Sequence, residues 1–110
     1  MKKLGILILI VSILIMAISC VSKDEIIGTW NSEYTYNGNS FNYTFTLEND
    51  GTWTGIVYKN GYLSSTKYGT YTIEGNKVSL RENGEVSKTI YTYSSGTLEN
   101  SGRIFKKITR

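Results

Sequence analysis

Turn-forming dipeptides recur at short intervals from residue 37 onward, and their spacing constrains the fold of this chain more than any other feature. The seven dipeptides are Asn37-Gly38, Asp50-Gly51, Asn60-Gly61, Gly75-Asn76, Asn83-Gly84, Ser95-Gly96 and Ser101-Gly102. They supply the positive φ angles that tight β-hairpins require. Because no proline and no amphipathic helix interrupts them, they separate eight candidate strands that should pair antiparallel in sequence order.

Between the turns, apolar and polar residues alternate with a period of two. In residues 41–48, every odd-numbered residue is apolar or aromatic and every even-numbered one is polar, which is the pattern of a strand with one buried face. The alternation recurs around Tyr71 and around Tyr91. The segment Tyr62–Tyr68 alternates poorly, so we expect it to be irregular, which leaves the strand count open by one.

Short strands in this order predict an all-β fold, an antiparallel up-and-down meander of about eight strands that closes into a small barrel. Closure removes the exposed edges that would otherwise pair with other chains. An open sheet or a two-sheet sandwich is the alternative. We expect one domain, residues 28–110, which is large enough for one core but not for a core and a large ligand chamber.

The first nineteen residues have a different composition from the rest of the chain. Lys2 and Lys3 precede an uncharged apolar run from Leu4 to Ile18, which is the layout of a helical secretory signal peptide. The run is short for a membrane-spanning helix, which needs about 20 apolar residues, and no basic cluster follows it. We therefore predict that residues 1–19 are a cleaved signal peptide, with an uncleaved anchor helix as the alternative.

The only cysteine of the chain lies directly after this segment. Met16-Ala17-Ile18-Ser19-Cys20 resembles the lipobox of bacterial lipoproteins. The resemblance implies that the Cys20 thiol receives a diacylglycerol, that the signal peptidase cuts before it, and that the cysteine carries several acyl chains, such as palmitate. Stable attachment to a membrane takes more than one chain. A free or buried cysteine after an ordinary secretory signal is the alternative.

Residues 20–27 would then be the lipidated cysteine and a short tether. So short a tether holds the domain close to its membrane. In a two-membrane bacterium, Val21 is not the aspartate that usually signals retention in the inner membrane. The resemblance therefore predicts a lipid-anchored protein of the cell envelope, in the outer membrane.

The domain itself carries a series of short motifs. Gly28-Thr29-Trp30 opens the first strand and is followed by Asp50-Gly51-Thr52-Trp53 and by Gly69-Thr70-Tyr71-Thr72-Ile73. Their order resembles that of the small bacterial lipocalin-like domains found in lipoproteins, along most of the mature chain. The resemblance implies a lipocalin-like barrel that binds a small ligand. The chain is far shorter than a typical lipocalin, however, so tyrosine and phenylalanine side chains are expected to fill part of the interior.

The G-x-W motif also implies roles for particular residues. In lipocalins its tryptophan plugs the closed end of the barrel, and a basic residue of the last strand packs across it. Carried over to this sequence, the barrel-end signature is Gly28, Trp30 and Arg103, with Lys106 and Lys107 as alternatives to Arg103. A cation over an indole face contributes about 0.5 to 1 kcal/mol or more.

The aromatic residues of the strands either line a ligand pocket or form the core. The candidates are Phe41, Tyr43, Phe45, Trp53, Tyr71, Tyr91 and Tyr93. As a pocket they would bind a small apolar or ring-bearing molecule, with tyrosine hydroxyls as polar contacts. For residues 41–47 a core role is the favoured interpretation. Of Trp53 and Tyr58, one is expected to face outward, where it would be a candidate for contact with a partner.

The composition argues against catalysis. The chain has no histidine, so the commonest general base near neutral pH and the commonest metal ligand are both missing. Its carboxylate pairs lie on the tether or beside a turn, where local hydrogen bonds explain them, and its serines have no base or glycine-rich elbow beside them. We expect no enzyme activity, no cofactor and no metal site.

The choice of partner follows from export and charge. The formal net charge of +3 includes Lys2 and Lys3, which leave with the signal peptide, and an exported domain near neutrality is a poor candidate for nucleic-acid binding. The basic residues at 103–110 are interpreted as a solvated last strand. The sequence thus predicts a monomeric binding module for a small hydrophobic or amphipathic ligand, anchored to a membrane through Cys20. The alternative is a protein-interaction or structural envelope module with a filled barrel.

Overall fold

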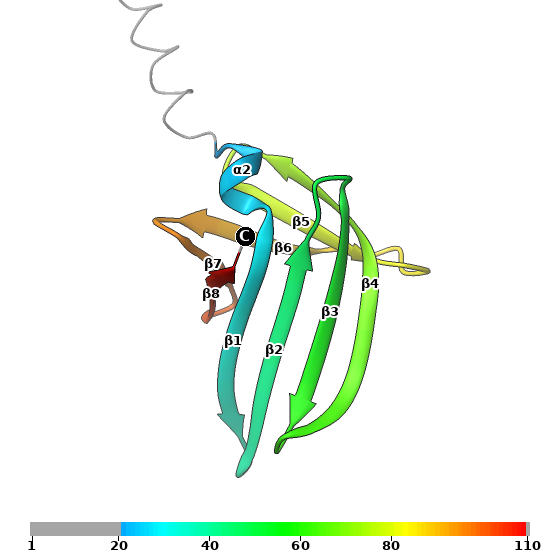
Figure 1. The fold of residues 1–110 in the computed structure, drawn as a ribbon, viewed down its shortest axis with the longest axis vertical. Coiled ribbons are helices and arrows are strands. Elements are labelled where there is room, and N and C mark those ends of the chain that lie inside the picture. The colour runs from blue at the N-terminus through cyan, green and yellow to red at the C-terminus, as the bar shows by residue number, and fades with distance from the viewer. Residues whose placement is uncertain (1–20, 110) are drawn as a thin grey trace, which may run out of the picture.

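The computed structural model describes residues 21–109, and their strands form one closed barrel (Figure 1). The strands are β1 (Gly28–Tyr36), β2 (Asn39–Leu47), β3 (Thr52–Lys59), β4 (Tyr62–Glu74), β5 (Lys77–Glu82), β6 (Thr89–Ser94), β7 (Thr97–Asn100) and β8 (Arg103–Thr109). A short helix, α2 (Lys23–Ile26), precedes them. Each strand pairs antiparallel with the next, and β8 pairs with β1 to close the barrel. The predicted all-β, eight-stranded up-and-down barrel is confirmed. The predicted signal peptide and Cys20 lie outside the described residues.

All seven predicted turns connect strands of the barrel. In four of them both central residues have a positive φ: Asn37-Gly38, Asn60-Gly61, Ser95-Gly96 and Ser101-Gly102. Two successive positive φ angles define the type I′ turn, whose twist matches that of the flanking strands. The local sequence therefore determines both where each hairpin reverses and how its strands cross.

The segment Tyr62–Tyr68, expected to be irregular, is part of the continuous strand β4. The pairing with β3 shifts there, because Val57 lies opposite Ser65 while the next residue, Tyr58, lies opposite Leu63. Ser64 is the extra residue of a β-bulge. A bulge moves the following side chains to the other face, which explains the poor alternation. The strand count of eight holds.

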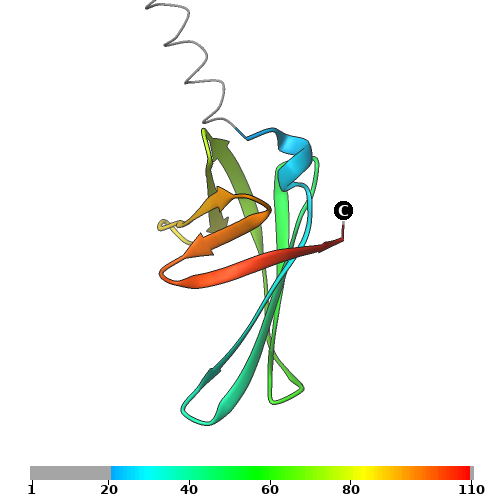
Figure 2. The same ribbon diagram turned by 90° about the vertical axis from the view of Figure 1, so that its left-hand side faces the viewer.

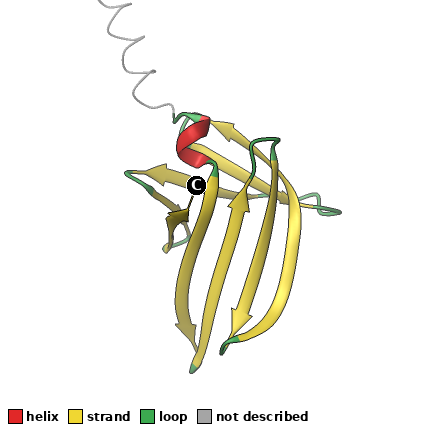
Figure 3. Cartoon of the chain, in the orientation of Figure 1, coloured by secondary structure: helices red, strands yellow, loops and turns green. Residues whose placement is uncertain are grey.

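The two halves of the barrel differ in length. The long strands β1–β4 form two hairpins that run well past the short strands β5–β8, as Figures 1 and 2 show. Helix α2, red in Figure 3, lies at the opposite end from the two hairpin tips. The barrel is therefore complete only near α2, and the inner face of β1–β4 continues beyond it as an open sheet.

The core fills the complete part of the barrel. Its buried residues are Ile26, Trp30, Phe45, Leu47, Trp53, Tyr71, Val78, Leu80, Tyr91, Leu98 and Phe105. At its centre the Phe45 ring lies 4.8 Å from that of Phe105 and 5.3 Å from that of Tyr91, measured between centroids. Burying each large side chain stabilises the fold by about 1.5 to 3 kcal/mol. The favoured core interpretation is confirmed for Phe45 and Leu47, whereas Phe41 and Tyr43 are only partly buried.

Gly69 lies where the packing of β4 against Arg81 and Trp53 leaves no room for a side chain. It lies opposite Trp53 on β3, and a Cβ placed there would be 1.8 Å from the carbonyl oxygen of Arg81 and 2.9 Å from the Trp53 indole nitrogen. The indole N–H donates a hydrogen bond to that same carbonyl at 3.1 Å. Glycine is therefore required here by space, and it fixes the position of the Trp53 ring.

Candidate functional site

The end of the barrel beside α2 is closed by Trp30. Its indole is fully buried, and its N–H donates to the Ile26 carbonyl at 2.9 Å. The ring of Tyr93 meets it edge-on at 6.4 Å between centroids. Because Ile26 is itself buried in the core, the helix acts as a plug, and beside it lies an open hollow of about 370 Å³ whose lining includes Val21, Lys23 and Tyr71.

The cation over Trp30 is Lys107, and the prediction that assigned Arg103 to this role is wrong. The Lys107 ammonium lies 5.8 Å from the Trp30 ring centroid and donates to the carbonyl oxygens of Asp24 and Glu25 on α2. Lys107 pairs directly with Trp30 across β1 and β8. Arg103 is four residues away, about 13 Å along a strand, and its guanidinium stacks on Tyr34 at 3.8 Å.

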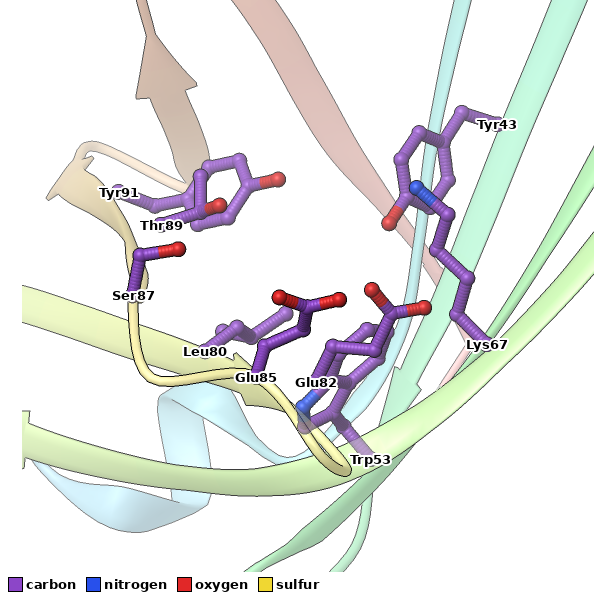
Figure 4. Close-up of a pocket in the computed structure, with 9 residues that line it drawn as sticks. All are labelled: Tyr43, Trp53, Lys67, Leu80, Glu82, Glu85, Ser87, Thr89 and Tyr91. Carbon is purple, nitrogen blue, oxygen red and sulfur yellow. The ribbon is translucent and has the colours of Figure 1, made fainter.

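The other half of the interior holds a pocket of about 160 Å³ (Figure 4). Its lining residues are Tyr43, Trp53, Lys67, Leu80, Glu82, Glu85, Ser87, Thr89 and Tyr91. Trp53 and Leu80 supply apolar surface, while most of the other side chains carry a polar group. The loop 83–88 between β5 and β6 forms one wall and the inner face of β2–β4 the other, so the pocket lies where the barrel gives way to the open sheet.

The two tyrosine hydroxyls of the pocket have no hydrogen-bond partner among residues 21–109. Tyr91 is 5% exposed, yet its hydroxyl points into the pocket, as does that of Tyr43 (Figure 4). Burial raises the pKa of both phenols above the ordinary tyrosine value, and the Glu82 carboxylate raises that of Tyr43 further. Both are therefore neutral phenols at neutral pH, each able to donate and to accept a hydrogen bond.

The pocket is lined by acidic and basic side chains that form no ion pair with one another. Within the described part of the chain, neither the Glu82 nor the Glu85 carboxylate forms an ion pair. Across the pocket, the Lys67 ammonium lies 5.9 Å from the Tyr43 ring centroid. A cation over an aromatic face is attracted to it, so the ring holds Lys67 on the β4 wall, away from the loop that carries Glu85.

The predicted site residues separate into three groups. Tyr43, Trp53 and Tyr91 line the pocket, and Phe45 belongs to the core beneath it. Phe41 stacks on Tyr34 at 5.1 Å between centroids, on the inner face of the open sheet. Tyr71 and Tyr93 lie at the closed end, where the Tyr71 hydroxyl donates to the Glu48 carbonyl and Tyr93 packs against Trp30. Neither of these two lines the pocket of Figure 4, although Tyr71 lines the hollow beside α2.

Sequence reasoning missed the charged part of the pocket. Glu82 was detectable, because it continues the inward alternation of Val78 and Leu80 on β5. A glutamate on an inward face is unusual, since burying a carboxylate is unfavourable unless it is paired. Glu85, Ser87 and Lys67 had no comparable signal, because the loop 83–88 and the bulge on β4 determine where they point.

The structure shows which of Trp53 and Tyr58 faces outward. Trp53 faces inward and is 3% exposed, whereas Tyr58 is 40% exposed on the outer face of β3. Tyr58 lies opposite Leu63, and Ile56 is two residues away on the same face. Tyr58 is therefore the outward aromatic that the alternation predicted.

The fold defines a class of protein, a small antiparallel up-and-down barrel with one closed end and with a polar pocket beside the loop 83–88. No helix in the described part of the chain is long and apolar enough to cross a membrane. Among residues 21–109, no three Asp, Glu, His or Cys side chains gather as a metal site would require. Comparison with protein-family models, with curated protein sequences and with solved structures gives no significant match.

Proposed function

We propose that this protein is a lipid-anchored lipoprotein of the bacterial envelope whose barrel binds a small amphipathic molecule beside Trp53, without catalysis. The observation that carries the proposal is the Tyr91 hydroxyl, which sits on a side chain that is 5% exposed, points into the pocket and has no hydrogen-bond partner among residues 21–109. Because no buried side-chain polar atom of the described residues lacks a partner, this hydroxyl opens onto the pocket. A bound molecule can donate a hydrogen bond to it or accept one from it.

The size of the pocket limits the ligand. Its volume of about 160 Å³ is close to that of an engineered cavity of about 150 Å³ that binds benzene, and it is below the usual range for drug-sized ligands. The core rings of Phe45 and Phe105 fill the space beneath it. Trp53 and Leu80 offer apolar surface, and the tyrosines and glutamates offer hydrogen bonds. This combination favours a single-ring or comparably small amphipathic molecule over a long apolar one.

The lipid anchor is proposed from the signal-peptide layout and from Cys20. Residue 21 donates a backbone hydrogen bond to the Gly75 carbonyl, so the chain leaves the barrel at the end where α2 lies (Figure 1). A lipid on Cys20 would therefore hold the closed end near the membrane and direct the tips of the β1–β2 and β3–β4 hairpins away from it. We propose the outer membrane as the location.

The binding proposal is tested by tryptophan fluorescence, because Trp53 lines the pocket and Trp30 lies at the closed end. Single-ring amphipathic probes with neutral, cationic and anionic groups are titrated into the full-length chain. We expect a saturable change in emission that persists in Trp30→Phe and disappears in Trp53→Phe. If no probe changes the emission of the folded protein, the binding function is wrong.

The anchor is tested separately. We expect mass spectrometry to find a mature N-terminus at an acylated Cys20, and we expect Cys20→Ser to move the protein out of the membrane fraction. An unmodified Cys20 or an intact residue 1–19 segment would refute lipidation. Neither result depends on the pocket.

A filled-barrel interaction module is the second candidate. The observation that favours it is the exposure of large side chains around the hairpin tips: Tyr36 at 66%, Tyr62 at 79% and Leu63 at 62%. Exposed apolar side chains that cluster on a surface mark contact sites for partners. A folded barrel whose Trp53 emission responds to no probe would favour this function over ligand binding.

A further inference from the structure

Building on the proposed function, we infer that the ligand of the pocket carries an ammonium or a similarly compact cationic group, which the carboxylates of Glu82 and Glu85 bind opposite the Tyr91 hydroxyl. The inference concerns the chemical class of the ligand. It is carried by the positions of the three side chains and by their lack of partners within residues 21–109.

The two carboxylates come from a single structural unit. Glu82 ends β5 and Glu85 lies in the loop that follows, where the Glu85 backbone N–H donates to the Glu82 carbonyl at 3.0 Å. This tight turn brings both side chains to the same side of the pocket, and Figure 4 shows both directed into it. The turn therefore places two negative charges on one side of the pocket, where a ligand cation would be attracted to both.

Two basic groups lie near these carboxylates, but neither forms an ion pair with them within residues 21–109. Lys67 lies over the Tyr43 ring at 5.9 Å and Arg103 over the Tyr34 ring at 3.8 Å, each measured to the ring centroid. Lys67 lines the same pocket from the β4 wall, so the place left for a ligand cation is the loop side, beside Glu82 and Glu85. A charge-assisted hydrogen bond from a ligand ammonium is about twice as strong as one between neutral groups.

The position of Tyr91 is a second, independent observation that points to a ligand at the two carboxylates. Tyr91 is only 5% exposed. Its hydroxyl has no partner in the described chain and faces the pocket from β6 (Figure 4). Its phenol oxygen can accept a hydrogen bond from an ammonium. Trp53 and Leu80 leave an apolar surface for the remainder of the ligand.

The experiment compares two probes of the same size, 2-phenylethylamine and 2-phenylethanol. Binding to the full-length chain is followed through Trp53 emission in the Trp30→Phe background. We expect the amine to bind at least about ten times more tightly than the alcohol, and we expect this ratio to shrink as salt is raised, because the pocket is open to solvent on one side.

Single and double variants identify the residues that cause the preference for the amine over the alcohol. Glu82→Gln combined with Glu85→Gln should bring the ratio close to one, while Glu99→Gln, an exposed glutamate of β7, should leave it unchanged. Tyr91→Phe should weaken amine binding without loss of the folded barrel. Lys67→Met should tighten amine binding, because it removes a like charge from the opposite wall.

The outcomes separate this inference from the proposed function. If both probes bind equally, or if the double glutamine variant keeps the preference, the ligand class is wrong although the pocket is a binding site. Weaker amine binding in Lys67→Met would contradict the expected repulsion between Lys67 and the ligand cation and would also overturn the inference. If neither these probes nor an anionic one changes Trp53 emission, the proposed function itself fails.

Discussion

The two ends of the barrel interior satisfy their polar groups in different ways. At the α2 end the Trp30 N–H, the Tyr71 hydroxyl and the Lys107 ammonium all reach backbone carbonyls. At the pocket end the Tyr91 hydroxyl and the Glu82 carboxylate have no hydrogen-bond partner in the described chain. The first arrangement stabilises the fold, and the second leaves polar groups open to the pocket. Under the proposed function, stability and binding would depend on opposite ends of the barrel.

The largest expected effect is at the closed end. Trp30→Ala removes a fully buried indole and its hydrogen bond to Ile26, and we expect a loss of about 3 to 5 kcal/mol in the free energy of unfolding. Tyr36→Ala, at a position that is 66% exposed on the open sheet, should cost less than about 0.5 kcal/mol. Denaturant unfolding of both variants measures the difference. If both variants lost a similar amount of unfolding free energy, the closed end would not be the more stabilising end of the barrel.

A second variant tests the boundary between the two ends. Gly69→Ala forces a Cβ against the Arg81 carbonyl and the Trp53 indole, and we expect a loss of about 1 to 3 kcal/mol or more from overpacking. Gly55→Ala is the matched control, because its nearest atoms belong to the Trp53 and Tyr43 side chains at 3.0 and 3.3 Å, which can shift. Thermal unfolding should rank Gly69→Ala below Gly55→Ala, and the reverse order would contradict the packing described here.

Alkaline pH should weaken the barrel through its buried tyrosines. Burial raises the pKa of Tyr43, Tyr71 and Tyr91 in the folded chain, so the unfolded chain loses these protons first. Their contribution is complete below about pH 10 and is lost as the pH rises above it. Tyr91 has the most strongly raised pKa of the three, so it should contribute most to the loss of stability between pH 8 and pH 11. Unfolding measured at pH 8 and pH 11 tests this, and Tyr91→Phe should reduce the difference.

The smallest effect compares one hydroxyl from each end. Tyr71→Phe removes a donor to the Glu48 carbonyl and should cost about 1 kcal/mol. Tyr91→Phe removes a hydroxyl without a partner in the described chain, so the free energy of unfolding at neutral pH should stay unchanged or rise slightly. A loss in Tyr91→Phe as large as in Tyr71→Phe would mean that the pocket hydroxyl is satisfied after all.

Prediction from sequence succeeded where the signal is local. The Asn-Gly and Ser-Gly dipeptides specify the type I′ turns, and the period-two alternation identifies the inward face of β2. The same alternation predicted that one of Trp53 and Tyr58 faces outward, and the structure shows that it is Tyr58. It could not distinguish Arg103 from Lys107, because both share the inward face of β8 and only the β1–β8 register decides which one meets Trp30.

What the sequence by itself determined is the order of turns and, for strands that alternate cleanly such as β2, the face that points inward, since both depend on residues close together in the chain. The tertiary structure alone decided which end is closed and where the pocket lies. The reason is that the pocket brings together Tyr43, Glu82 and Tyr91 from three strands. Their meeting depends on strand length, on the bulge at Ser64 and on the closure of β8 against β1, and none of these can be read from the residues that meet.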